Sequence, residues 1–369
     1  MKILLMGDAS NFHRALSLAL RKIGHDVVVA SNGSRWMDTA RDIDISRHSG
    51  KLGGALLWAK IIANKKKFSG FDVVQIVNPV FVELKPVRVA RLFDYLKSNN
   101  SRVFLTALGD DTPYIQLCDD PTALSYNEWR NHDGSPTPHL LALRPLHDAW
   151  LSDPLRAHCH YIYSRIDGAA TALYEYHLAC RRVLPPKKVT YTGIPIDAQA
   201  VAPAHGESVP DRLRLFIGLQ RGRMTEKGSD RLLAAAKSVV ERHPDRCELV
   251  VVENRPYAEY VEMMRSSHVI LDQIYSYTPA TNALLAMASG LIAVSGGEDD
   301  YYRFIGETEN RPIVNALPDD EALRNALTDI VTHPGRFPEH SRRSREFALK
   351  HNDSAIVAQR FIDFWNHSS

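Results

Sequence analysis

Apolar residues in this chain alternate between short continuous runs and longer stretches with helical spacing. Lys2–Met6 is a continuous run that ends at Gly7, and from Phe12 to Ile23 apolar residues recur at the spacing of one helix face. Asp26–Ala30 is a second continuous run. Strands buried on both faces give continuous apolar runs, whereas amphipathic helices repeat every 3.6 residues. The start of the chain therefore predicts a strand–helix–strand unit.

The same alternation continues through the first half of the chain. Further strands are expected at Asp72–Val77, Arg102–Ala107, Tyr161–Ser164 and Val189–Gly193, and helices at Val87–Lys97 and Asp167–Arg182. The stretch from Cys118 to Leu151 breaks this pattern, because it is rich in Pro, Asp, Asn and His. A loop of this length is either functional, as a lid or an acceptor-side element, or a packed structural insertion.

A second alternating series follows Pro210. Its strands are expected at Leu213–Gly218, Glu248–Val252, Val269–Asp272, Ile292–Val294 and Ile313–Ala316, and its helices at Ser229–Glu241, Tyr257–Ser266, Pro279–Ser289, Glu321–Thr332, Glu339–Lys350 and Ala355–Trp365. The segment before Pro210 is rich in Ala, Pro, Gly and Ser, which is typical of an interdomain linker. The fold class is therefore α/β, with two Rossmann-like doubly wound domains facing a cleft. The domains are assigned to residues 1–197 and 211–350, with a linker at 198–210 and a last helix within 351–369.

Composition and charge narrow the class of protein. The 369 residues are 44% hydrophobic and 24% charged, which is ordinary for a soluble globular protein and excludes a fibrous or disordered chain. A net charge of +2 gives no reason to expect a nucleic-acid partner. The first apolar run is too short for a signal peptide, and no stretch approaches the roughly 18 apolar residues that span a bilayer. We therefore expect a cytoplasmic protein.

The cysteines and the histidines beside them do not predict a metal site. Four cysteines without paired spacing are too sparse for a disulfide framework. In His158-Cys159-His160, a strand would turn both histidines away from Cys159, and no second ligand pair follows at zinc-site spacing. Neither a metal nor another cofactor is expected.

Candidate chemistry lies in the loops after the strands, because ligands of open parallel sheets bind at the carboxyl ends of the strands. The first such loop of the second series carries Arg221, Arg223 and Lys227. Arginine forks bind phosphate oxygens bidentately and lysine acts as a point charge, so this cluster suits a diphosphate. The alternative is a solvated basic loop.

A second anion site is predicted at the start of a later helix. Pro279 suits the first position of that helix, and Thr278 suits its cap. A helix N-terminus presents free N–H groups and the positive end of a dipole, which attract an anion. The alternative is simply a well-capped helix.

These two loops resemble a known family. The segment from Arg223 to Lys227-Gly228, followed by an amphipathic helix, resembles the donor loop of glycosyltransferases with the GT-B fold. The segment 272–290, which contains Ala286–Leu291 (AMASGL), is similar to the nucleotide-sugar motif of glycosyltransferase family 4. The resemblance covers most of residues 212–317 and extends weakly over the N-terminal half.

The chain departs from the family motif at several positions. The Glu-x7-Glu positions of the family hold Tyr277 and Leu285, and three residues rather than four separate Arg223 from Lys227. Leu285 cannot accept the ribose hydrogen bonds that the second Glu makes, and Tyr277 could contact a sugar only through its phenol. Replacement hydrogen bonds would come from polar side chains nearby, namely Asp272, Gln273 or Glu298.

The resemblance implies a GT-B enzyme that transfers a hexosyl group from a UDP- or GDP-linked donor to a saccharide or lipid-linked acceptor. It also implies retention of configuration, no metal, a role in polysaccharide or glycolipid assembly, and a last helix that packs back on the first domain. The catalytic residues are expected to be Asp110, Arg223 and Lys227. The donor-binding residues are expected to be Gly7, Ser10, Asn11, Arg221, Asn254, Gln273, Tyr277, Thr278 and Thr281, and the acceptor-side residues His13 and Asp111.

The N-terminal half supplies fewer signals. The turn from Gly7 to Asn11 lies where the loop of the family approaches the donor phosphate, and it lacks the GxGxxG pattern of dinucleotide folds. His13 opens the first helix, where it either faces the cleft or is structural. Asp110 and Asp111 follow a strand, where carboxylates either take a proton from an acceptor hydroxyl or bind the sugar, or simply form a turn.

Two other functions stay open. An NDP-sugar epimerase or hydrolase would keep the fold and would need catalytic acids in the cleft. A non-catalytic subunit is suggested by the missing Glu pair. Separately, Ala55–Phe68 combines apolar residues with three lysines, so it is either a peripheral contact to the inner face of the membrane or a helix packed on its own sheet.

Overall fold

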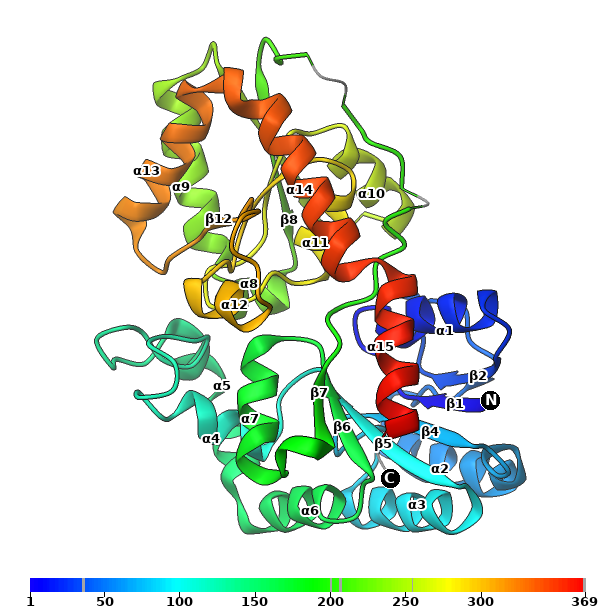
Figure 1. The fold of residues 1–369 in the computed structure, drawn as a ribbon. Helices are drawn as coiled ribbons and strands as arrows, with labels where there is room; N and C mark the ends of the chain where they lie inside the picture. Colours follow the sequence, from blue (N-terminus) through cyan, green and yellow to red (C-terminus); the bar gives the residue numbers. More distant parts are fainter. Residues whose placement is uncertain (35–36, 200, 206–207, 254, 368–369) are drawn as a thin grey trace. The chain divides into compact units, whose positions relative to one another are not determined.

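The computed structural model describes residues 1–34, 37–199, 201–205, 208–253 and 255–367. The chain forms two compact units. The N-terminal unit consists of Met1–Leu117, Pro145–Pro195 and Ser354–Ser369, and the C-terminal unit consists of Cys118–Arg144 and Ile196–Asp353. Each unit contains one parallel sheet with helices packed against it (Figure 1).

The sheet of the N-terminal unit has the strand order β3-β2-β1-β4-β5-β6-β7, and every pairing is parallel. Its strands are β1 (Lys2–Met6), β2 (Asp26–Ser31), β3 (Ile43–Asp44), β4 (Val73–Val77), β5 (Arg102–Ala107), β6 (Gly168–Thr171) and β7 (Val189–Tyr191). The direction of strand succession reverses between β1 and β4, and the loops at such a switch point are where ligands of doubly wound sheets bind.

Helices cover both faces of this sheet. They are α1 (Phe12–Lys22), α2 (Gly53–Ala63), α3 (Pro86–Asn99), α4 (Thr112–Cys118), α5 (Pro138–Leu151), α6 (Asp153–Tyr163), α7 (Tyr174–Val183) and α15 (Ser354–His367). Helices α1 and α15 lie on one face, and α2, α3 and α6 lie on the other (Figure 1). Central strands such as β4 are buried along their whole length, which explains their continuous apolar sequence.

The last helix, α15, belongs to the N-terminal unit. Its Phe361 ring lies 6.1 Å from the ring of Phe12 in α1. Trp365 is buried, and its Nε1–H donates a hydrogen bond of 2.9 Å to the side chain of Gln75 in β4. The helix is thus anchored by aromatic packing and by a polar contact to the middle of the sheet.

One part of the sequence prediction is wrong in this unit. Residues 161–163, which we expected in a strand, end helix α6, and the missing strand β6 (Gly168–Thr171) lies where a helix was expected to begin. The sequence GAAT of β6 is small because Phe364 of α15 packs on it: a Cβ atom at Gly168 would lie 2.5 Å from that ring. Because this strand has no run of large apolar residues, its sequence does not show the pattern by which we predicted the other strands.

The sheet of the C-terminal unit has the strand order β12-β11-β10-β8-β9, again all parallel. Its strands are β8 (Leu213–Leu219), β9 (Cys247–Glu253), β10 (Val269–Leu271), β11 (Ile292–Ser295) and β12 (Val314–Asn315). Its helices are α8 (Met224–Lys227), α9 (Ser229–Arg242), α10 (Tyr257–Arg265), α11 (Thr281–Ala288), α12 (Asp299–Phe304), α13 (Asp320–Thr332) and α14 (Phe337–Asn352).

Two domain boundaries differ from the expected ones. Residues 118–144, which we call the inserted segment, pack with the C-terminal unit although we assigned them to the first domain. The division falls within α5, where Leu143 has non-helical angles and Pro145 follows. Two residues of the expected linker contact the rest of the protein: Ala198 is buried, and the N–H of Ala204 donates to the carbonyl of Ser289 at 2.9 Å.

Across the described ranges, no helix combines the length and the apolarity that crossing a bilayer requires.

Candidate functional site

Lys227 and Asp272 form an ion pair at the carboxyl ends of β8 and β10. Lys227 Nζ lies 2.8 Å from Asp272 Oδ1, and the two side chains are 14% and 1% exposed. Ser295, at the end of β11, donates to the second carboxylate oxygen at 3.2 Å. The lysine is held in place because its carbonyl accepts the N–H of Ile274 and because Gly228, with φ +66°, turns the chain where a side chain would overlap Ile274.

The two arginines of the same loop are more exposed and also have carboxylate partners. Arg223 Nε donates to Glu226 Oε2 at 2.9 Å, and a second guanidinium nitrogen contacts the other oxygen. Arg221 is 81% exposed and pairs with Glu253. Of the three predicted cations, Lys227 alone has a mostly buried side chain. The ion pairs of the two exposed arginines are screened by solvent and therefore weaker.

Helix α11 begins later than the sequence predicts. Its first residue is Thr281 and its N-cap is Ala280, so Pro279 is not the first helical residue and Thr278 is not the cap. The carbonyl of Thr278 accepts hydrogen bonds from Ser276 Oγ at 2.8 Å and from Gln273 Nε2 at 3.3 Å. These contacts close a separate turn, which delays the helix by two residues.

The inserted segment packs on three strand-end loops of the C-terminal unit. The N–H of Ser125 donates to the hydroxyl of Tyr277 at 2.7 Å, after β10. The hydroxyl of Tyr126 donates to Glu298 Oε1 at 2.6 Å, after β11. His139 Nδ1 lies 3.4 Å from the hydroxyl of Thr225, after β8. Sequence reasoning missed these contacts; the clustered aromatic residues of the segment were its signal of packing.

In the N-terminal unit, the turn after β1 has an unusual backbone. Gly7, Ser10 and Asn11 all have positive φ, at 81°, 52° and 64°. The N–H of Asn11 donates to Ser34 Oγ at 2.9 Å, and the N–H of His13 donates to Asp8 Oδ1 at 2.8 Å. Non-glycine residues in this region are uncommon and cost strain, so side-chain contacts hold the turn in shape.

His13 lies in the interior rather than on the surface of the unit. Its side chain is 0% exposed, and its Nδ1 lies 2.8 Å from the carbonyl of Gly7, so this nitrogen carries the proton. Its Nε2 lies 3.5 Å from Thr106 Oγ1, which in turn accepts a hydrogen bond from Gln75. Burial lowers the pKa of His13 to about 4, which keeps the imidazole neutral.

Only one of the two neighbouring aspartates after β5 is near the surface. Asp111 is buried, where it accepts hydrogen bonds from the Tyr163 hydroxyl at 2.6 Å and from the Tyr114 N–H at 2.9 Å. Burial raises the pKa of Asp111 to about 6. Asp111 therefore holds the start of α4, whereas Asp110 is half-buried. The pKa of Asp8 is likewise raised to about 6 by burial.

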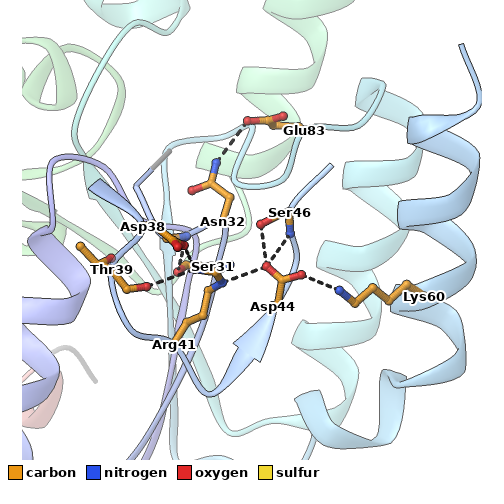
Figure 2. A network of polar contacts seen from close by, with 10 residues as sticks. Ser31, Asn32, Asp38, Thr39, Arg41, Asp44, Ser46, Lys60 and Glu83 are labelled. Carbon is orange, nitrogen blue, oxygen red and sulfur yellow. Dashed lines mark hydrogen bonds and ion pairs between the residues drawn. The ribbon is translucent and has the colours of Figure 1, made fainter. Parts of the chain in front are cut away.

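A charged network lies at the ends of β2 and β3 (Figure 2). Asp44 accepts hydrogen bonds from Lys60 at 2.7 Å, from Ser46, and from Arg41 Nε at 2.8 Å. Burial favours the neutral acid, but these donors hold the pKa of Asp44 well below its usual range. Nearby, the side-chain amide of Asn32 donates to Glu83 at 3.2 Å. The network stabilises the short β3 edge, and sequence reasoning did not identify it.

The remaining candidate residues differ in how far they are buried. Ser10 is exposed, Gln273 and Thr281 are half-buried, and Tyr277 and Thr278 are buried, while Asn254 lies outside the described residues. His158 and Cys159 lie on helix α6 and not on a strand, and His158 Nε2 contacts the carbonyl of Pro79 at 3.0 Å. Within the part of the chain that the structure describes, no group of three or more potential ligands could hold a metal ion.

Comparison with known proteins identifies the fold. No protein-family model matches the sequence, and no curated protein matches it. Solved structures do match over nearly the whole chain. Sucrose-phosphate synthase from Thermosynechococcus elongatus has a TM-score of 0.61 at 13% identity, with coverage of 99% of this chain and 98% of that one. HepE from Anabaena, in complex with UDP and glucose, has a TM-score of 0.59 at 13% identity, with 98% of each chain covered.

A third similar structure has a different activity in its name. A putative UDP-N-acetylglucosamine 2-epimerase from Listeria monocytogenes has a TM-score of 0.56 at 14% identity, covering 98% of this chain and 94% of that one. The chain thus has the two-domain GT-B fold, with a Rossmann-like parallel sheet in each domain. Because transferases and an epimerase share this fold, the fold alone does not select the reaction.

Proposed function

We propose that this protein transfers a hexosyl group from a nucleotide diphosphate sugar to a saccharide or lipid-linked acceptor, with retention of configuration. The observation that carries the proposal is the part-buried ammonium of Lys227 at the carboxyl edge of the C-terminal sheet. A lysine has three N–H donors, and the bond to Asp272 uses one of them. The remaining donors can bind a diphosphate without loss of the ion pair.

In the proposed reaction, the bond between the anomeric carbon and the β-phosphate oxygen breaks, and its electron pair stays on the leaving diphosphate. The acceptor oxygen bonds to that carbon on the same face and gives its proton to Asp110. Lys227 and Arg223 neutralise the charge that develops on the diphosphate, assisted by backbone N–H groups at the start of α11. Preorganised charge of this kind is usually the largest catalytic contribution, and no step needs a metal.

The nature of the donor and acceptor is supported by independent observations. HepE, which has the same fold, was crystallised with UDP and glucose, which favours a uridine nucleotide as the first donor to test. Leu52, Leu56 and Ile62 are exposed on or beside α2, and Lys65–Phe68 follows with three lysines. Exposed apolar residues beside lysines suit an anionic membrane surface, where a lipid-linked acceptor resides. We therefore propose that the protein is cytoplasmic and acts at the inner face of the membrane.

Two alternatives have their own support. An NDP-sugar epimerase or hydrolase fits the similarity to the Listeria epimerase. A non-catalytic subunit fits the replacement of the Glu-x7-Glu pair by Tyr277 and Leu285.

A thermal-shift screen with UDP, GDP and their hexose derivatives tests the proposal. A donor at about 100 times its dissociation constant adds about 2.7 kcal/mol of stability. Binding followed by transfer to an added acceptor supports the transferase. Free sugar or an epimer formed without acceptor supports the epimerase or hydrolase, and binding of neither nucleotide supports the subunit.

A further inference from the structure

A hexosyl donor needs hydrogen-bond acceptors for its hydroxyl groups, and a carboxylate is the strongest acceptor that a protein offers. The carboxylates at the strand ends of the C-terminal unit are mostly committed to cations. The ion-paired ones are Glu226 with Arg223, Glu253 with Arg221, Asp272 with Lys227, Asp299 with Arg311 and Asp300 with Arg303. Glu298 differs from all of them.

Glu298 is held by a neutral donor. Its Oε1 accepts the hydroxyl of Tyr126 at 2.6 Å, and its backbone N–H donates to the carbonyl of Tyr277 at 3.2 Å. Across the residues that the structure describes, no cation pairs with its carboxylate, and no donor reaches Oε2. The side chain is half-buried, so this oxygen is an oriented acceptor in a partly desolvated position.

The other two polar candidates beside it are already engaged. Asp272 accepts from Lys227 on one oxygen and from Ser295 on the other, and it is buried. Gln273 donates its amide to the carbonyl of Thr278 within its own loop. Unlike Asp272, Glu298 can therefore accept a new hydrogen bond on a carboxylate oxygen without losing an existing one, and unlike the ion-paired carboxylates it has no cation as a partner.

Tyr126 fixes the position of Glu298 from the inserted segment. Its side chain is 1% exposed, and its ring packs 5.1 Å from Tyr277 and 4.6 Å from His132. The adjacent Ser125 anchors the segment to the hydroxyl of Tyr277. The hydrogen bond from this buried hydroxyl to Oε1 therefore restrains the orientation of the carboxylate.

We propose that Glu298 accepts hydroxyl hydrogen bonds from the hexosyl group of the donor, and that Tyr126 of the inserted segment positions its carboxylate. This inference rests on the proposed function. It names the sugar-binding residue of the donor site, and it gives the inserted segment a role in sugar selection. Binding of the nucleotide diphosphate itself does not involve Glu298.

Calorimetry with UDP and UDP-glucose, repeated with GDP and GDP-mannose, tests the role of Glu298. In Glu298→Gln, the affinity for the nucleotide sugar is expected to fall about tenfold or more, because hydrogen bonds to a charged group are the strong ones. The affinity for the bare nucleotide should stay within about twofold. Asp299→Asn is the matched control: it neutralises the next carboxylate, which Arg311 holds, and should leave both affinities within about twofold.

Tyr126→Phe tests the positioning role. It is expected to weaken nucleotide-sugar binding by about threefold to tenfold in the wild type, and to have no further effect in Glu298→Gln. Tyr302→Phe is its control, since the hydroxyl of this buried tyrosine accepts the N–H of Ile313, whereas its contact with Glu298 runs from its backbone N–H to the Glu298 carbonyl and is kept in the variant. It should destabilise the fold without changing the ratio of the two affinities.

The outcomes separate this inference from the proposed function. If the wild type binds a nucleotide sugar and Glu298→Gln leaves the ratio of the two affinities unchanged, the role of Glu298 is wrong and the transferase proposal stands. Equal losses for nucleotide and nucleotide sugar also overturn it, because Glu298 would then only support the loop. A wild type that binds none of the four probes overturns both.

Discussion

The loops after β8 and β10 of the C-terminal unit differ in charge from the loops after β1 and β5 of the N-terminal unit. In the C-terminal unit, Lys227 and Asp272 face each other as a partly buried ion pair. At the ends of β1 and β5 in the N-terminal unit, neutral hydrogen-bond donors and acceptors hold Asp8, His13 and Asp111. Burial raises the pKa of both aspartates and lowers the pKa of His13, and both changes favour the neutral form of the side chain. Paired charges suit an ionic ligand, whereas isolated titratable groups suit a neutral ligand and the transfer of protons.

The comparison supports the proposal that the C-terminal unit binds the diphosphate and the N-terminal unit binds the neutral acceptor. It also predicts different responses to mutation. Removal of one charge of the Lys227–Asp272 pair leaves the other charge buried without a partner. Substitutions at the titratable residues of the N-terminal unit are expected to change how stability depends on pH.

The largest effect is expected for Lys227→Ala. The transfer rate should fall by about 10²–10³-fold, because the charge that faces the diphosphate is lost. The free energy of unfolding should also fall by about 3–5 kcal/mol, because Asp272 stays buried without its partner. Initial rates and urea unfolding measure the two effects.

The double variant Lys227→Ala/Asp272→Asn separates these contributions. Removal of both charges should restore much of the stability while transfer stays low. A folded double variant with wild-type rates would remove Lys227 from the mechanism.

The next largest effect is expected in the pH dependence of stability, through His13. The folded pKa of His13 is about 4 because of burial, below the ordinary value of 6.5, so the unfolded chain binds more protons between these values. The stability that His13 contributes is complete above pH 6.5 and is lost as the pH falls toward 4, by roughly 3 kcal/mol. Urea unfolding of wild type and His13→Asn at pH 7 and pH 4.5 measures it. Parallel losses in both proteins would show that His13 does not titrate in this way.

A smaller effect is expected for Tyr163→Phe. This change removes the hydroxyl that donates to Asp111 and should cost about 1–3 kcal/mol at pH 7. Because the folded pKa of Asp111 is raised to about 6 from 3.8 by burial, the stability that its neutral form contributes is present at low pH and is lost as the pH rises through 6. The cost of the mutation should therefore shrink toward pH 4, in unfolding curves that compare it with wild type.

The smallest effect is expected for Arg221→Ala. The side chain is 81% exposed and its pairing with Glu253 is screened, so stability should change by no more than about 0.5 kcal/mol. The transfer rate should fall by about threefold at most. A loss as large as that of Lys227→Ala would mean that the exposed arginine, and not the partly buried lysine, binds the diphosphate.

Much of the fold could be predicted because buried parallel strands and amphipathic helices have local signatures. The continuous apolar runs indicated β1, β4 and β5, and the alternation of strands and helices indicated two doubly wound sheets. The same pattern located the loop of Lys227 at a strand end, since the loop follows directly from the run that precedes it. These features depend on residues close together in the sequence.

The remaining features depend on contacts between distant residues. Strand β6 is small because Phe364 packs on it, and the start of α11 is set by a turn that its own pattern does not reveal. Ser125 and Tyr277 are separated by 152 positions, and Tyr126 and Glu298 by 172. The sequence alone thus determined most of the elements and the fold class, because periodicity reports local burial. The tertiary structure decided which charges are paired and which unit holds the inserted segment, because no local pattern encodes the partner of a side chain.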